Sequence, residues 1–409
     1  MSPTFVPRSL LAPCPATLPR DGRLDVFRGL AMFIIFIAHM PGNVWALWMP
    51  GRFGFSDATE IFVFCSGMAS AIAFGRAFDR HGWSMGTARI AHRVWQLYWA
   101  HLGLFFALAG LMALLGDAQG MPRDYVGQLN LYPFFKDPQT NLVGLLTLTY
   151  VPNYFDILPM YIVVLALVPV VMALARIHLG LAALFVTVTW AIGTTGAVGL
   201  PAEPWSQRAW FFNPFAWQLV FFTGFAFARG WITPPPVERR FVVAALAVVL
   251  LSLPLAYFRI LNAMPALREL ADILHPLTTK TGFGILRYVH FLALAYLAWV
   301  AVGPAGCRLH RAGWTGQAIE IVRKVGQQSL PIFLAGMVLA RLGGVALDLL
   351  GRNALTVPLV NLAGLALLVA TAYLAAWFKA QPWRGLPAAR PTEIGLAEPA
   401  APVEGAPVR

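Results

Sequence analysis

Three ionisable side chains lie in an apolar stretch near the start of the chain, "LDVFRGLAMFIIFIAHM", residues 24–40. They are Asp25, Arg28 and His39, and at about 100° per residue of an α-helix all three share one face. Ionisable groups in membrane helices are costly and usually face a bundle interior or an aqueous cavity. We therefore predict that His39 is a general base, with an interfacial histidine as the alternative. Asp25 and Arg28 could instead form a structural ion pair.

The next apolar run begins with "GFSDATEIFVFCSG", which places Asp57 and Glu60 three residues apart. If this helix returns beside the first, both carboxylates lie at the level of His39. A carboxylate beside a histidine fixes its tautomer and stabilises the imidazolium, so we predict Glu60 as the partner of His39. Asp57 is a second candidate, although it could equally cap the helix N-terminus.

Other polar side chains collect near the same predicted end of the later apolar runs. Each one alone could be a structural hydrogen-bonding group or a snorkelling cation. Their convergence on one depth from several runs favours a substrate-binding site. The residues are Tyr154, Asp156, Asn213, Gln218, Lys280, Arg287 and His290.

The amino-acid composition indicates which class of protein positions these residues. Of 409 residues, 58% are hydrophobic and 12% are charged, whereas a soluble domain carries about a quarter charged residues. This indicates a polytopic membrane protein. The net charge of +12 comes without a nucleic-acid-reading motif, so no nucleic-acid partner is expected. Three scattered cysteines are too few for a zinc site, and no metal is expected.

We predict an all-α bundle of about ten membrane helices, because each needs about 20 mostly apolar residues. The segment 141–152 is too short to cross. Lys and Arg concentrate on one side, which favours two cytoplasmic termini; Arg341 is assigned to an outer segment. Residues 1–22 and 381–409 are predicted disordered tails around a membrane domain at 23–380. The predicted helices are 24–44, 58–76, 94–115, 157–175, 179–199, 214–229, 241–260, 284–303, 325–347 and 355–378.

Two blocks, "RLDVFRGLAMFIIFIAHMPGN" and "FGFSDATEIFVFCSG", resemble the opening of the OpgC family of inner-membrane proteins, which succinylate osmoregulated periplasmic glucans. "FFNPFAWQLVFFTGF" and "VGQQSLPIF" resemble later blocks, so the likeness covers about 20–380. The spacing of Arg28 and His39 is more distantly similar to the acyltransferase-3 superfamily. Glu60, and Ala335 and Gly336 in place of a further histidine, depart from that superfamily and favour OpgC.

The resemblance implies transfer of an acyl group from cytoplasmic succinyl-CoA to a periplasmic β-glucan, with no permanently bound cofactor. His39, supported by Glu60, would be the base. Asn213 or Gln218 would stabilise the oxyanion and Arg287 or Lys280 the succinyl carboxylate. The donor would contact five residues, which are Asp25, Arg28, Arg76, Arg89 and Arg93.

Three alternatives remain open at this stage. A transporter or flippase would also use buried ionisable groups, although no inverted repeat is visible. The acyl group could be acetyl rather than succinyl, since both donors share the CoA handle. The chain has no G-x-S-x-G motif, yet Cys65 or Ser66 could still carry a covalent acyl group. The oligomeric state is not predicted.

Overall fold

The computed structural model describes residues 22–117 and 122–384, and all regular elements in these ranges are helical. The predicted all-α class is confirmed. Six helices are long and apolar enough to cross a membrane; they are Ala58–Gly116, Ile157–Ile177, Arg239–Ala256, Ile285–Val302, Ser329–Leu350 and Thr356–Arg384. The predicted count of ten and the side of the termini stay predictions. The predicted tails lie outside the described residues, apart from residues 22 and 381–384.

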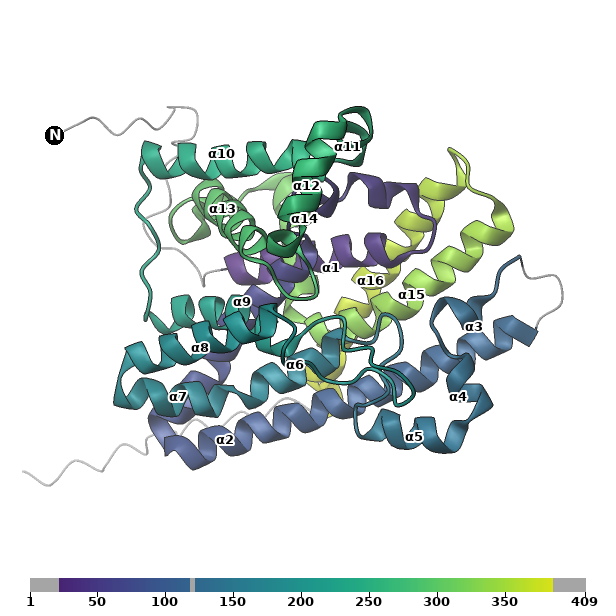
Figure 1. Cartoon of the computed structure of the whole chain (residues 1–409), viewed down its shortest axis with the longest axis horizontal. Coiled ribbons are helices and arrows are strands. Elements are labelled where there is room, and N and C mark those ends of the chain that lie inside the picture. The colour runs from purple at the N-terminus through teal and green to yellow at the C-terminus, as the bar shows by residue number, and fades with distance from the viewer. Residues whose placement is uncertain (1–21, 118–121, 385–409) are drawn as a thin grey trace, which may run out of the picture.

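The helix that carries the opening polar residues, α1 (Arg23–His39), lies near the centre of the molecule (Figure 1). It packs against α14 (Gly313–Gln327) and α15 (Ser329–Leu350). A Cβ at Gly29 would lie 2.0 Å from the Val322 carbonyl oxygen, and one at Gly326 would lie 1.8 Å from that of Asp25. Only glycines allow two helix backbones to approach so closely.

The predicted helix 325–347 begins too early, because the helical geometry is interrupted at Gln328. What precedes the interruption is α14, an amphipathic helix that the sequence reasoning missed. Charged and polar residues alternate with apolar ones in "GQAIEIVRKVGQ", so this segment has no continuous apolar run. A search for membrane-length hydrophobic runs does not detect such a helix.

The longest helical stretch is α2 (Ala58–Asp117), which contains the two predicted helices 58–76 and 94–115. Non-helical dihedral angles at Gly82 (φ 79°, ψ −180°) separate its two parts. A positive φ of this kind favours glycine because it has no Cβ. A Cβ at Gly86 would lie 2.5 Å from the Phe78 ring, so the chain changes direction between these residues. The predicted connecting loop is therefore a short break between helical segments.

The predicted helix 157–175 is divided into α6 (Ile157–Ala166) and α7 (Val168–Ile177). Pro169 explains the interruption, because proline cannot donate the backbone hydrogen bond that continues a helix. The chain continues through α8 (Leu179–Thr194) into α9 (Pro214–Arg229), which packs along α2. Figure 1 shows these helices grouped beside α2.

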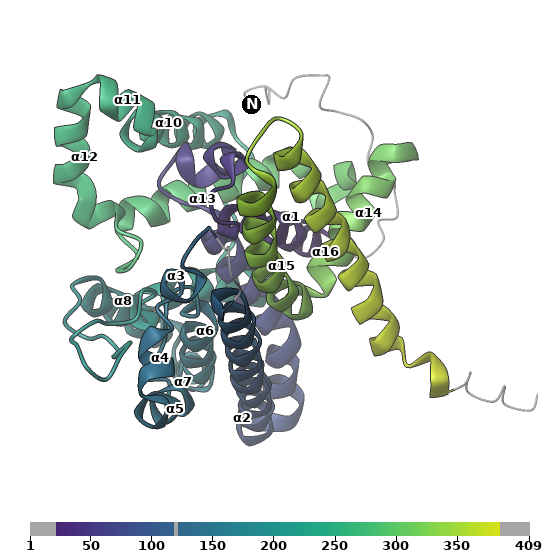
Figure 2. The ribbon, with the colours of Figure 1, turned by 90° about the vertical axis from the view of Figure 1, so that its right-hand side faces the viewer.

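The remaining helices, both short and membrane-length, complete the described part of the chain. Figure 2 shows α10, α11 and α12 together at one edge, away from α16. The predicted short segment 141–152 corresponds to the end of a nine-residue helix, α5. The elements are α3 (Tyr125–Gln128), α4 (Tyr132–Lys136), α5 (Pro138–Leu146), α10 (Arg239–Ala256), α11 (Phe258–Ala263), α12 (Pro265–Thr278), α13 (Ile285–Val302), α16 (Thr356–Ala380), and the 3-10 turns Val44–Trp48, Pro50–Arg52, Pro304–Leu309 and Pro382–Arg384.

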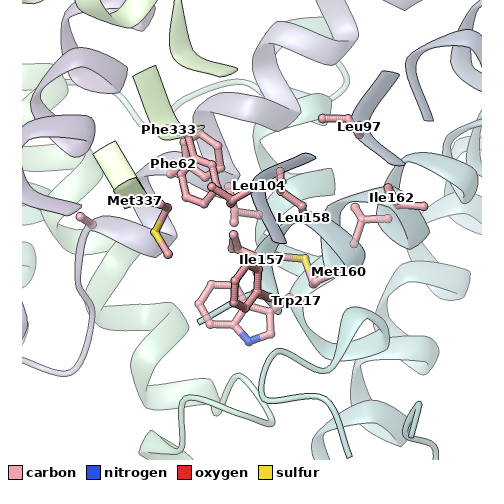
Figure 3. Packing of buried hydrophobic residues seen from close by; sticks show 14 of the residues in the cluster. Phe62, Leu97, Leu104, Ile157, Leu158, Met160, Ile162, Trp217, Phe333 and Met337 are labelled. Atoms are coloured by element: carbon pink, nitrogen blue, oxygen red, sulfur yellow. The ribbon is translucent and has the colours of Figure 1, made fainter. Parts of the chain in front are cut away.

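A buried apolar cluster joins these helices into one body. Figure 3 shows Phe62 and Leu104 of α2 near Phe333 of α15, with Trp217 of α9 on the other side of the cluster. Phe62 and Phe333 stack with ring centroids 6.1 Å apart. Trp217 is fully buried and donates its indole N–H to the Lys280 carbonyl at 2.9 Å. The cluster therefore holds the segment before α13 against α9.

Candidate active site

His39 is the last residue of α1 and is half-buried. Its Nδ1 atom lies 2.8 Å from the carbonyl oxygen of Ile35, one turn earlier in the same helix. A carbonyl oxygen only accepts hydrogen bonds, so Nδ1 carries the proton in this contact. In the neutral ring Nε2 is then the unprotonated, basic nitrogen. The backbone of α1 therefore holds the tautomer that a general base acting through Nε2 requires.

The surroundings of His39 are aromatic and cationic. The Tyr154 ring contacts it edge to face, with centroids 5.7 Å apart. The Arg341 guanidinium lies 4.2 Å from the centroid of the same Tyr154 ring. Lys280, Arg341 and Asp57 are all close enough to act electrostatically on His39. Residues far apart in the sequence thus meet at the C-terminal end of α1.

Within the described part of the chain, no hydrogen bond or ion pair joins His39 to Glu60. Glu60 Oε2 instead accepts the backbone N–H of Asp57 at 2.7 Å, and Asp57 Oδ1 accepts that of Thr59 at 2.8 Å. The two carboxylates therefore cap the N-terminus of α2 reciprocally, as in a capping box. The alternative reading of Asp57 as a cap is confirmed, and Glu60 belongs to the same motif.

The remaining carboxylate oxygens form ion pairs with the segment that leads into α13. Lys280 Nζ lies 2.5 Å from Asp57 Oδ2, and Arg287 Nη1 lies 2.8 Å from Glu60 Oε1. These residues make a four-charge cluster (Asp57, Glu60, Lys280 and Arg287) with two charges of each sign. Burial by itself would raise the pKa of Asp57, but Lys280 and Arg287 hold it well below its ordinary value.

His290, one helical turn after Arg287 in α13, contacts the loop that leads into α2. Its Nδ1 accepts the Ser56 backbone N–H at 3.2 Å and lies 2.7 Å from the Ser56 hydroxyl oxygen. Its ring also occupies the space where a side chain at Gly54 would stand, 2.2 Å from Nε2. His290 is therefore a structural residue of the 54–60 loop in this geometry.

The amide side chains predicted to stabilise an oxyanion direct their hydrogens elsewhere. Asn213 Nδ2 donates to the carbonyls of Gly193 and Val198, while its Oδ1 caps α9 at Phe215. Gln218 Nε2 donates to Val186 at 2.7 Å. Both side chains are buried and join α9 to α8 and the segment after it. Gln218 Nε2 also donates to the Phe215 carbonyl at 3.2 Å, so in this structure the amide hydrogens of both side chains bond to backbone carbonyls. Their role at an oxyanion stays a prediction.

Tyr154 and Asp156 lie in the turn before α6. Tyr154 has a positive φ of 74° and an exposed ring. Asp156 is buried and accepts the Phe211 N–H at 2.8 Å, which fixes the turn to the segment before α9. Burial raises the pKa of Asp156 to about 6. Asp156 therefore positions the turn that presents Tyr154 to His39.

Residues 20–380 match the model of the family described as OpgC protein. The chain belongs to the OpgC family. This membership indicates an acyltransferase-type function on glucans in a membrane setting. No curated protein and no solved structure matches the chain.

At the N-terminal end of α1, this OpgC-family chain uses Asp25 and Arg28 in helix packing. Among the described residues they do not pair with each other. Asp25 is buried and accepts a hydrogen bond from Gln327 at 3.4 Å, and Arg28 Nη2 donates to the Ser329 hydroxyl. Arg28 Nε is buried without a hydrogen-bond partner in the described ranges, so one donor of this guanidinium stays available.

The three arginines predicted to hold CoA phosphates lie near the Gly82 break of α2. Arg76 and Arg89 are exposed, and Arg93 is half-buried and donates to Gln96 at 3.0 Å. They lie on both sides of the break, where the chain changes direction. Their role in donor binding stays a prediction.

Arg341 is the residue of this region that the sequence reasoning misplaced. It was assigned to an outer segment, but it lies within α15 and is only 3% exposed. One signal could have indicated this: "LPIFLAGMVLARLGGVALDLL" is apolar on both sides of the arginine. A cation in the interior of such a run is a candidate functional residue.

Proposed function

We propose that the protein transfers a succinyl group from succinyl-CoA to a hydroxyl group of a periplasmic β-glucan, with His39 as the general base. One observation carries this proposal: the Ile35 carbonyl holds the Nδ1 proton of His39, which leaves Nε2 free to accept another. Family membership supports the acyl transfer and the glucan acceptor.

The reaction needs one proton transfer in each direction. Nε2 of His39 removes the proton from a sugar hydroxyl as its oxygen attacks the thioester carbonyl. The carbon–sulfur bond then breaks, and the imidazolium returns the proton to the departing CoA thiolate. The products are a glucan succinyl ester and CoA with a free thiol.

The donor is proposed to enter from the N-terminal end of α1 on the cytoplasmic side of a bacterial inner membrane, with both chain termini on that side. Arg76, Arg89 and Arg93 would bind the CoA phosphates, since guanidinium groups match phosphate oxygens. Arg28, with its free Nε donor, would lie along the path to His39. The glucan would approach the opposite end of α1.

The decisive experiment uses the purified full-length protein in vesicles, labelled succinyl-CoA and a linear or cyclic β-glucan. We expect alkali-labile label on the glucan and a stoichiometric release of free CoA thiol. Label that enters the vesicles unchanged, without ester formation, would instead identify a transporter. Absence of ester with any acyl-CoA would rule out the proposed reaction.

A further inference from the structure

A buried cation that has no carboxylate partner among residues 22–117 and 122–384 lies beside the candidate base. Arg341 is 3% exposed, and its Nη2 atom is buried without a hydrogen-bond partner in the described part of the chain. Its described neighbour is the Tyr154 ring, 4.2 Å from the guanidinium carbon. Arginine stays protonated in proteins, and an uncompensated buried charge is costly. We expect such a guanidinium to bind an anionic ligand during the reaction.

Helix packing fixes Arg341 at the level of His39. Two residues further along α15, a Cβ at Gly343 would lie 2.7 Å from the Met40 side chain, and three residues further, one at Gly344 would lie 2.6 Å from Pro41. The C-terminal end of α1 thus crosses α15 just after Arg341. Tyr154 lies between the two groups, with its ring contacting both His39 and the guanidinium.

The other cations near His39 are already neutralised. Lys280 pairs with Asp57, and Arg287 pairs with Glu60, which has no exposed surface. An incoming carboxylate at either position would have to displace a protein carboxylate. The same carboxylate at Arg341 would meet a guanidinium that has no carboxylate partner in the described part of the chain. Its planar fork can donate hydrogen bonds to two carboxylate oxygens. The sequence-based assignment of Arg287 or Lys280 to this role is therefore less consistent with the structure.

We propose that Arg341 binds the free carboxylate of a dicarboxylic acyl donor and so selects succinyl over neutral acyl groups; this rests on the function proposed above. The two carbonyl carbons of a succinyl group are separated by three carbon–carbon bonds, roughly 4 Å when extended. In the proposed pose the thioester carbon lies near Nε2 of His39 and the carboxylate lies at the Arg341 guanidinium. Tyr154 orients the guanidinium from one face, which leaves its edge for the ligand.

The test compares succinyl-CoA with butyryl-CoA, which has the same four acyl carbons but a methyl group in place of the carboxylate. In the wild-type protein we expect succinyl transfer to the glucan to be strongly preferred. In Arg341→Gln we expect kcat/KM for succinyl-CoA to fall roughly 30-fold to 1,000-fold, while butyryl transfer is unchanged or rises. Arg341→Lys keeps the charge and should retain part of the preference.

Arg123→Gln is the matched control, because it also removes one positive charge but from a half-exposed side chain paired with Asp348. It should leave the succinyl-to-butyryl ratio unchanged. The inference is overturned if wild-type protein uses both donors equally, or if Arg341→Gln or Arg341→Lys lowers both transfers by the same factor. If Arg341→Gln does not fold, the ratio in Arg341→Lys decides. Failure of the proposed function looks different, since no acyl-CoA would then acylate the glucan.

Discussion

The two ends of α1 use their polar residues in opposite ways. At the N-terminal end, Asp25 and Arg28 bind Gln327 and Ser329 where α1 crosses α14 and the start of α15. At the C-terminal end, His39 has an intrahelical carbonyl on one nitrogen and only aromatic and charged neighbours around the ring. The sequence presents both ends alike, as polar groups on one helical face.

The difference lies in which hydrogen-bonding groups the fold leaves unused. Close backbone contact at Gly29 and Gly326 draws Asp25 and its neighbours into a packed crossing. At the other end, Nε2 of His39 and Nη2 of Arg341 have no described hydrogen-bond partner. Buried polar groups in native proteins are normally satisfied, so unpaired ones point to a ligand. At the N-terminal end Arg28 Nε is also unpaired in the described ranges, but Asp25 and Arg28 Nη2 bond across the helix crossing. We therefore expect the proton transfer at the C-terminal end, and packing together with donor contact at the N-terminal end.

The largest expected effect is on catalysis. His39→Gln keeps a side chain of similar size but removes the base, so glucan acylation should fall roughly 10²- to 10⁴-fold. The melting temperature should change little, because the Ile35 carbonyl is the one described hydrogen-bond partner of His39 and the Tyr154 ring its one described ring contact. The measurement is the label-transfer assay together with a thermal melt. His310→Ala, at an exposed position, is the matched control; a His39→Gln protein with wild-type activity would refute the proposed base.

At the crossing of α1 and α14, the expected effect is on stability. Gly29→Ala places a methyl group 2.0 Å from the Val322 carbonyl oxygen, so the helices must move apart at a cost of roughly 1–3 kcal/mol. Thermal unfolding in detergent measures this. Gly103→Ala is the control, since nothing lies within 4 Å of its Cβ position. Equal melting temperatures for the two variants would contradict the close crossing.

The four-charge cluster beside His39 is expected to behave as structure, with a defined pH dependence. The folded-state pKa of Asp57 lies below its ordinary value of 3.8, so its contribution to stability is present above that value and is lost as the pH falls through the folded pKa. The difference in melting temperature between wild type and Asp57→Asn should be constant at neutral pH and shrink below pH 3.8. A difference that grows on acidification would show that the carboxyl is not held ionised by Lys280.

The smallest expected effect is that of Asp25→Asn. An amide oxygen can still accept the long hydrogen bond from Gln327, so glucan acylation should change by less than about threefold, within the net value of one hydrogen bond. The KM for the acyl-CoA donor should stay close to that of wild type. A large rise in this KM would instead place Asp25 in the donor path and weaken the contrast between the two ends of α1.

Local sequence patterns predict several parts of the fold. Long apolar runs predicted most of the membrane-length helices, and the sequence "SDATE" carries the Asp-x-x-Glu pattern of a helix cap. Apolar runs do not predict helix α14, because polar residues interrupt its apolar positions. The break in the predicted helix 157–175 follows from Pro169, which a closer reading of the sequence could have detected.

The sequence by itself determined the all-helical class, the membership of the OpgC family and the choice of His39 as the residue to test. Only the tertiary structure decided which charges neutralise one another. Glu60 and Arg287 are separated by 227 residues in the chain, and no local pattern predicts their contact. Charge pairing in a buried site depends on distances between helices, which are set by packing at glycine crossings and aromatic contacts. That packing pairs Lys280 and Arg287 with carboxylates, and it leaves Arg341 near the base with no carboxylate partner among the described residues.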